Sequence, residues 1–183
     1  MKKLTRLTAL LLTGALLLVL TACEAAPNLV GPEAEKRAKE EILNAIYELR
    51  TEEKLPEFVE VKALSAVEQD WINAFRDAPN NELSVSDIAK NLNEIYEKRE
   101  AVAPHWNRYG VTCGIRSSGV AWSLCYPTYD GNIDALRPML KAEFASGQFA
   151  SGQYKDSIYG IALAATTING KIYWVCTLFA PKT

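Results

Sequence analysis

Apolar residues in the first half of the chain recur every three or four positions, the spacing of amphipathic helices. One apolar stripe runs through 33–50 and a second through 62–76. A third begins after Ser84 or Ser86, either of which can cap a helix, and ends at Pro104. The pattern predicts three helices in this half of the chain.

The second half changes to β patterns. Residues 109–116 and 120–126 predict a hairpin. Residues 157–168 and 171–179 predict another, because the Asn169-Gly170 pair between them is typical of a type I′ turn.

A short helix is predicted between the two hairpins, over 132–144, with a late start because Pro138 suits a first turn better than an interior. The residues Phe-Ala-Ser-Gly-Gln then occur twice in succession, at 144–148 and 149–153, which indicates a small duplication in a loop. The order of elements predicts an α+β domain with helices packed against an antiparallel sheet.

The first residues follow a different pattern. Lys2, Lys3 and Arg6 precede an apolar run from Leu7 to Leu20, which has the order of charges and apolar residues of a signal peptide. The run has fourteen residues, whereas a membrane-spanning helix needs about 20.

The residues Leu20-Thr21-Ala22-Cys23 end this run and resemble the bacterial lipobox, in which signal peptidase II cuts before a lipid-modified cysteine. The resemblance implies a signal peptide over 1–22, a lipid on Cys23 and a short tether over 23–32. We therefore expect a protein anchored by lipid on the extracytoplasmic face of a cell membrane. An ordinary secretory signal followed by a chance cysteine is the alternative.

Removal of residues 1–22 would leave 183 − 22 = 161 residues, enough for one domain over 33–183. The removed segment carries three positive charges, so the net charge of −2 becomes −2 − 3 = −5. An acidic domain argues against a nucleic-acid partner, which usually calls for a basic surface.

Three cysteines remain beyond Cys23. Cys113 and Cys125 would lie opposite each other in the first hairpin if its loop has five residues, and diagonally if it has three. We predict a disulfide between them, with Cys176 left over. The cysteines form no metal-binding spacing, so neither a metal nor another cofactor is expected.

Two stretches resemble the CAP superfamily, the SCP-like extracellular domain of cysteine-rich secretory and pathogenesis-related proteins. The first runs from Ile42-Leu-Asn-Ala-Ile-Tyr-Glu-Leu-Arg50 through Leu55-Pro56 to Ala63-Leu-Ser-Ala66, and is similar to the family's L-x-x-x-N-x-x-R helix, Leu-Pro turn and following helix. The second is similar to the family's G-H-F, G-x-G-x-A and Y-W-V-C segments, at Gly147-Gln-Phe149, Tyr154-Lys155, Gly160-Ile-Ala162 and Tyr173-Trp-Val-Cys176 to Pro181.

The resemblance implies an α-β-α sandwich whose cleft holds a divalent metal through two histidines and acidic residues. Here Gln148 stands at the G-H-F histidine, and an amide is neither a base nor a good metal ligand. Tyr47 replaces the helix asparagine. The resemblance therefore implies a member of the family that lacks the reactive and metal-binding groups of the cleft. In such a member, Gln148 and Tyr154 would lie beside this cleft.

The candidate reactive groups are few. His105 is the single histidine and can be read as a base or pH-responsive contact, or as a residue just past a helix end, which we favour. A pair of Cys176 with His105 could form a nucleophile, but the cysteine alternates with apolar strand residues and is better explained as core. The sequence has no Gly-x-Ser-x-Gly elbow and no phosphate-binding glycine motif.

Aromatic residues gather around the first predicted hairpin. They could line a groove for a glycan, peptide or lipid, or form the core of a small sheet. The group comprises Trp106, Tyr109, Trp122, Tyr126 and Tyr129.

These observations favour a non-catalytic CAP-like binding or interaction domain, displayed by a lipid anchor, with a glycan, peptide, lipid or protein ligand. Its candidate cleft residues are Gln148, Tyr154, His105 and Trp106. The alternatives are a small envelope hydrolase with unidentified catalytic groups and an accessory lipoprotein without a small ligand.

Overall fold

The computed structural model describes residues 30–183, without the side chains of Gln153 and Asp156. The predicted signal peptide, Cys23 and most of the tether lie outside the described residues. The helices are α2 (Pro32–Glu52), α3 (Lys62–Asp77), α4 (Val85–Val102), α5 (Ile133–Leu140) and α6 (Gln153–Asp156), with short helical turns at η1 (Pro79–Asn81), η2 (Lys141–Ala145) and η3 (Gln148–Ala150). The strands are β1 (Val59–Glu60), β2 (Glu82–Ser84), β3 (Val111–Cys113), β4 (Ile115–Ser117), β5 (Ala121–Leu124), β6 (Gly160–Ile168) and β7 (Lys171–Phe179).

The main sheet has the strand order β1-β6-β7-β3. Its centre is the long β6–β7 hairpin, which pairs from Gly160 opposite Phe179 to Ile168 opposite Lys171. Asn169 and Gly170 both have positive φ, 50° and 74°, as a type I′ turn requires. The second hairpin is therefore confirmed, although its first strand starts at Gly160 rather than at Ser157.

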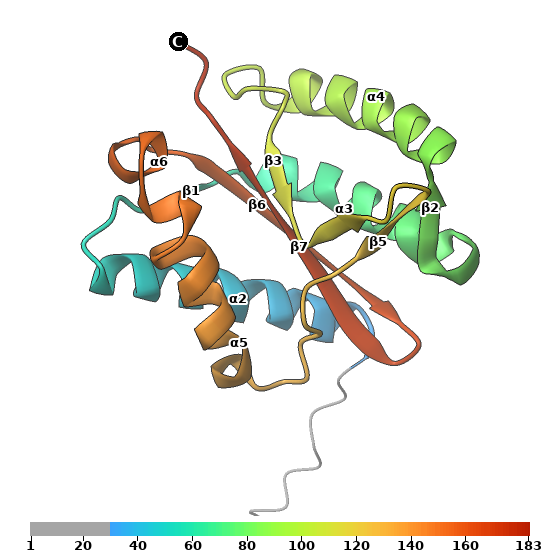
Figure 1. The fold of residues 1–183 in the computed structure, drawn as a ribbon, viewed down its shortest axis with the longest axis horizontal. Helices are drawn as coiled ribbons and strands as arrows, with labels where there is room; N and C mark the ends of the chain where they lie inside the picture. Colours follow the sequence, from blue (N-terminus) through green and yellow to red (C-terminus); the bar gives the residue numbers. More distant parts are fainter. Residues whose placement is uncertain (1–29) are drawn as a thin grey trace, which may run out of the picture.

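Helices cover both faces of this sheet. Ile161, Leu163 and Ala165 of β6 pack with α2 and α5 in one apolar cluster. The alternate residues Ala162 and Ala164 pack on the other face, against α3. Neighbouring strand residues point to opposite faces, and helices cover both faces of this sheet. Strand β6 is therefore apolar at nearly every position. Figure 1 shows the β6–β7 ribbon between α2 and α5 on one side and α3 and α4 on the other.

The three predicted helices of the first half are confirmed, and local residues explain where two of them begin. Gly31, at φ 98°, precedes Pro32 at the first helical position of α2, where a missing N–H costs nothing. Ser84, rather than Ser86, caps α4 by accepting a hydrogen bond from the Asp87 N–H.

The strand predicted over 109–116 is wrong as a single element. The chain bends at Gly114, whose φ of +95° favours glycine, and a Cβ there would lie 2.9 Å from the Tyr126 ring. Before the bend, β3 pairs with β7. After it, β4 pairs with β5, which pairs in turn with β2, so the predicted first hairpin belongs to a separate small sheet.

The predicted Cys113–Cys125 disulfide is likewise corrected. All three thiols of the described chain are free. Because β3 joins the main sheet, Cys113 is buried opposite Cys176 of β7, whereas Cys125 is exposed after the end of β5. The bend at Gly114 therefore gives Cys113 a different cross-strand neighbour from the one that the hairpin prediction assumed.

Helix α5 starts earlier than its proline suggested. Asn132 caps it by accepting from the Asp134 N–H at 3.1 Å, so Pro138 lies inside the helix. A wider turn over Lys141–Ala145 follows at once. The predicted late start is wrong, because the asparagine cap sets the first turn.

Candidate functional site

The four candidate cleft residues lie in two separate places. Gln148 is exposed, and the half-buried Tyr154 lies with its ring centroid 4.9 Å from that of Phe149, in the apolar cluster of α2 and α5. His105 is exposed, and Trp106 packs on Gly160 from the α3 side of the main sheet. The two pairs therefore belong to opposite faces of the sheet and do not form one cleft.

The thiol–imidazole pair is also separated. Cys176 is fully buried in the main core, and burial raises the pKa of its thiol well above the ordinary range. A thiol in this environment stays protonated, as expected for a core residue. The interpretation of Cys176 as core is confirmed.

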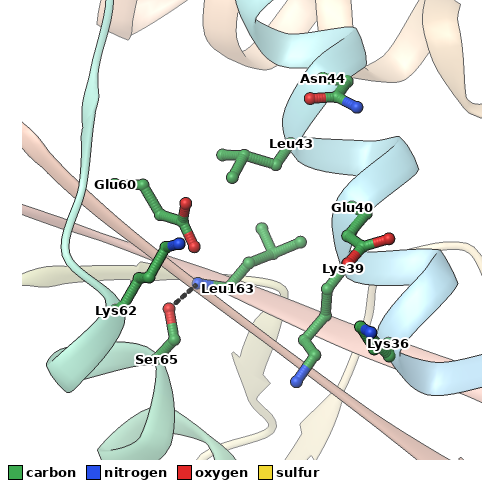
Figure 2. Close-up of a pocket in the computed structure, with 9 residues that line it drawn as sticks. All are labelled: Lys36, Lys39, Glu40, Leu43, Asn44, Glu60, Lys62, Ser65 and Leu163. Atoms are coloured by element: carbon green, nitrogen blue, oxygen red, sulfur yellow. Dashed lines mark hydrogen bonds between the residues drawn. The ribbon is translucent and has the colours of Figure 1, made fainter. Parts of the chain in front are cut away.

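The first cavity, of about 340 Å³, is a polar groove between α2 and the start of α3. Figure 2 shows its charged side chains on both sides of Leu163. Its polar lining includes Lys36, Lys39, Lys62, Glu40, Glu60 and Ser65. Groups of both signs line the groove, and their arrangement selects no single ligand class.

The groove continues along an open edge of the main sheet. Strand β1 pairs with β6 only at Gly160 and Ile161, so no strand of the described chain lies beside the later residues of β6 on this edge. Side chains of α3 take the place of that strand. Ser65 Oγ accepts from Leu163 N at 3.4 Å.

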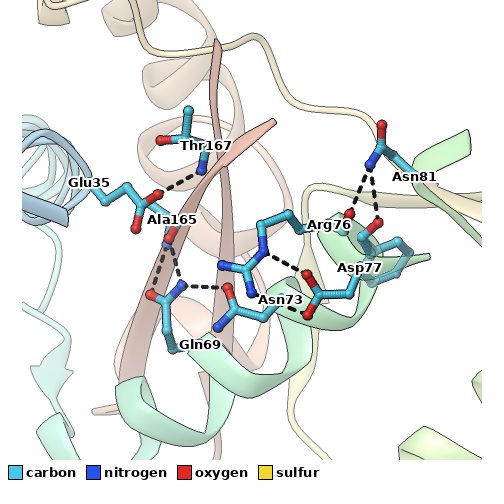
Figure 3. A network of polar contacts seen from close by, with 9 residues as sticks. Glu35, Gln69, Asn73, Arg76, Asp77, Asn81, Ala165 and Thr167 are labelled. Carbon is cyan, nitrogen blue, oxygen red and sulfur yellow. Dashed lines mark hydrogen bonds and ion pairs between the residues drawn. The ribbon is translucent and has the colours of Figure 1, made fainter. Parts of the chain in front are cut away.

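Gln69 and Glu35 complete this edge (Figure 3). Gln69 Nε2 donates to Ala165 O at 2.6 Å, and its Oε1 accepts from Ala165 N at 3.4 Å. Glu35 Oε1, from α2, accepts from Thr167 N at 2.7 Å. An edge strand is ordinarily open to pairing with another chain. Here the N–H groups of Leu163, Ala165 and Thr167 and the Ala165 carbonyl are occupied.

The second cavity, of about 220 Å³, lies between α3, α4 and the small sheet. We call it the aromatic cavity, because its walls include Trp71, Tyr96 and Trp122, with Ile115, Arg99 and Thr112. The wall residues come from α3, α4, β3, β4 and β5. Of the aromatic residues around the predicted first hairpin, Trp122 lines this cavity, whereas Trp106, Tyr126 and Tyr129 pack on core residues.

A buried ion pair adjoins this cavity. Arg99 binds Glu68 through two bonds, Nε to Oε1 at 2.7 Å and Nη2 to Oε2 at 2.8 Å. Glu68 is 0% and Arg99 2% exposed, so this planar bidentate geometry compensates for the loss of water around both charges. The pair joins α3 to α4.

Two threonines extend the ion pair. Thr177 Oγ1 donates to Glu68 Oε2 at 2.6 Å, which uses its only proton. The 2.9 Å contact between the hydroxyls of Thr112 and Thr177 therefore has Thr112 as donor. Thr112, which lines the cavity, also accepts from Arg99 Nη2 at 3.5 Å, so one of its two oxygen lone pairs is left to accept a bond.

Two donors beside the cavity have no partner. The Trp71 indole Nε1 is buried without a hydrogen bond to any residue in 30–183. Arg99 Nη1 likewise makes none within the described part of the chain, since its bonds use Nε and Nη2. For the buried Trp71 Nε1, the missing partner costs about 1–3 kcal/mol, which a bound acceptor would recover.

The sequence contained a signal for this site that helical periodicity alone did not identify. Glu68 lies on the stripe of Leu64, Trp71 and Phe75, and Arg99 continues the stripe of α4. A charged residue at an apolar position indicates a buried pair. Trp71 lies on the same stripe, where periodicity indicates a core residue, and a cavity wall built from several elements cannot be predicted from one helix.

No helix within 30–183 is long and apolar enough to cross a membrane. No cluster of histidine, cysteine and carboxylate side chains in that range has the composition of a metal site. Comparison with protein-family models, curated proteins and solved structures finds no match to this chain.

Proposed function

We propose that this chain is a bacterial lipoprotein, anchored by lipid on Cys23 at the extracytoplasmic face of a membrane, with a CAP-like domain that acts by binding a ligand. The aromatic cavity carries the binding part of the proposal. It combines a concave aromatic lining with two donors, Trp71 Nε1 and Arg99 Nη1, that have no hydrogen-bond partner among residues 30–183. Pockets of this composition are typical of small-molecule sites.

Contacts between the two stretches that resemble the CAP family support the family part of the proposal. Arg50, at the end of the first stretch, is fully buried and donates through Nη1 to the carbonyls of Phe144 at 2.8 Å and Phe149 at 2.9 Å. Phe149 belongs to the Gly-Gln-Phe segment of the second stretch. The helices on both faces of the sheet agree with the layers that the resemblance implies.

Binding is favoured over catalysis by the state of the three candidate reactive groups, Gln148, Cys176 and His105. Gln148 has an amide where the family has an imidazole, and it is exposed on η3. The Cys176 thiol is buried, with its pKa raised, and His105 is exposed on a different face of the sheet. None of these three side chains lines the aromatic cavity.

The anchor is tested by a Cys23→Ala variant of the full chain, expressed in bacterial cells that are then separated into membrane and soluble fractions. We expect the protein to move from the membrane to the soluble fraction with its thermal unfolding midpoint unchanged, because Cys23 lies outside the domain. Cys125→Ala is the matched control, since Cys125 is exposed and should not affect retention. Undiminished membrane retention of Cys23→Ala would contradict the lipid anchor.

A further inference from the structure

We infer that the aromatic cavity binds one uncharged sugar ring that carries an N-acetyl group, as part of a glycan. The inference rests on the proposed binding function and names its ligand class. It follows from the walls, the hydrogen-bonding groups, the charge and the size of the cavity.

The walls suit a ring with C–H groups on its faces. Tyr96 comes from α4, Trp122 from β5 and Trp71 from α3, so aromatic surface is presented by three different elements. An aromatic face is electron-rich and attracts the slightly positive C–H groups of a sugar. Tyr96 and Trp122 are half-buried, so part of each ring is accessible.

The polar groups call for both an acceptor and a donor on the ligand. Trp71 Nε1 and Arg99 Nη1 are donors without partners in the described chain, and a carbonyl oxygen such as that of an acetamido group would satisfy them. Thr112 offers the complementary lone pair to a hydroxyl or amide N–H of the ligand. A saturated acyl chain or a phenyl ring has none of these groups and would leave the donors unpaired.

Charge argues for a neutral ligand. The positive charge of Arg99 is already balanced by the bidentate bond from Glu68, so the base of the cavity is neutral as a whole. A carboxylate or phosphate would lose its hydration without gaining a net positive charge, which is unfavourable in a buried site. A neutral amide carbonyl gains a hydrogen bond without that cost.

The size fits a single ring inside and more of the glycan outside. The cavity of about 220 Å³ is smaller than the roughly 300–1,000 Å³ of pockets that hold drug-sized molecules. Tyr109 is 59% exposed and meets Tyr96 edge to face at 4.8 Å between centroids. It therefore extends the aromatic surface beyond the cavity and can contact a second sugar ring.

The test uses the full chain in a polyoxyethylene detergent, which contains no sugar. Isothermal titration calorimetry compares N,N′-diacetylchitobiose with cellobiose, two disaccharides that differ in acetamido against hydroxyl groups. We expect saturable binding of the acetylated sugar, about tenfold tighter than that of cellobiose, since each recovered hydrogen bond contributes about 0.5–1.5 kcal/mol and two can act here.

Variants locate the binding. Trp122→Ala and Tyr96→Ala, on different elements, should each weaken binding of the acetylated sugar by about tenfold. Trp71→Phe keeps an aromatic ring but removes the N–H, so it should reduce the preference for the acetylated sugar rather than all binding. This change in preference is a result that general destabilisation would not produce. Gln148→Ala, at the family's cleft position, is the control and should bind as the unaltered chain does.

Two results would overturn the inference that the aromatic cavity binds an N-acetylated sugar. No saturable heat with millimolar diacetylchitobiose would overturn the inference, as would binding that Gln148→Ala abolishes and Trp122→Ala leaves unchanged. Fractionation of Cys23→Ala is independent of both results. A chain that needs Cys23 for membrane retention but binds no sugar would therefore keep the anchored part of the proposed function and lose the ligand named here.

Discussion

Arg50 at the end of α2 and Arg99 near the end of α4 are both buried, and their charges are accommodated in different ways. Arg50 donates to the carbonyls of Pro56, Phe144 and Phe149, and its guanidinium lies 4.0 Å from the Phe58 ring centroid. No carboxylate binds it among the described residues. Burial lowers the pKa of Arg50 to about 10, so it is still charged at neutral pH.

Arg99, in contrast, has a full counter-charge in Glu68 and keeps one nitrogen beside a cavity. The two buried guanidinium groups therefore have different roles. Arg50 connects three backbone segments and has a structural role. Arg99 makes a neutral pair that leaves a donor at a surface where a ligand can reach it.

The largest expected effect comes from removing the counter-charge. Glu68→Ala leaves Arg99 buried and unpaired, which should lower the free energy of unfolding by about 3–5 kcal/mol. Urea unfolding followed by circular dichroism measures it. Asp70→Ala is the matched control, because Asp70 pairs with Lys98 across the same two helices but both are exposed, and it should cost less than about 1 kcal/mol.

A double variant sharpens this test. Replacing Glu68 and Arg99 together by leucine removes both charges, so most of the lost stability should return. A double variant as unstable as Glu68→Ala alone would show that packing rather than charge explains the loss.

Arg50→Met should have the next largest effect. Three carbonyls lose their donor, while the buried unpaired charge is also removed, so we expect a loss of about 2–3 kcal/mol. The segment over 144–149 should lose amide protection first in hydrogen exchange, because Arg50 binds it at both ends. Equal loss of protection in α4 would contradict a role confined to this contact.

Alkaline pH should cause the smallest change in the free energy of unfolding. Buried thiols and Arg50 contribute to this change with opposite signs. Burial raises the pKa of Cys113 from 9.0 to about 12, so the unfolded chain releases this proton before the folded chain does. Its contribution to stability is complete below pH 9 and is lost between about pH 9 and 12. Deprotonation of Arg50 changes the free energy of unfolding in the opposite direction, since burial lowers its pKa and the folded chain releases this proton first.

At pH 10 the Cys113 thiol should account for about 1 kcal/mol of lost unfolding free energy. Cys113→Ala should therefore reduce the fall in stability between pH 8.5 and 10, measured by urea unfolding. An unchanged fall would show that this thiol is not responsible.

The sequence predicted the elements that depend on neighbouring residues better than those that depend on distant contacts. The stripes of the three helices and the Asn169-Gly170 turn are local, and they were confirmed. The bend at Gly114 was missed because it depends on Tyr126 and β7, which lie far along the chain or across the sheet.

The candidate site was less predictable for the same reason. The aromatic cavity needs α3, α4 and three strands to come together, so spacing within one element could not show it. The charged residues at apolar positions, Glu68 and Arg99, together with Arg50, were nevertheless visible in the sequence. Their positions on the stripes predict burial, although not the partner of each.

The side chains that bind the open edge of β6 affect how copies of the domain can meet on a membrane. In the proposed anchored state, copies of this domain share a plane and meet one another more often than they would in free solution. An exposed strand edge would then allow copies to join through backbone hydrogen bonds. Ser65, Gln69 and Glu35 already bind three N–H groups and one carbonyl along this edge, so it offers a neighbouring copy on the bilayer fewer backbone groups to pair with.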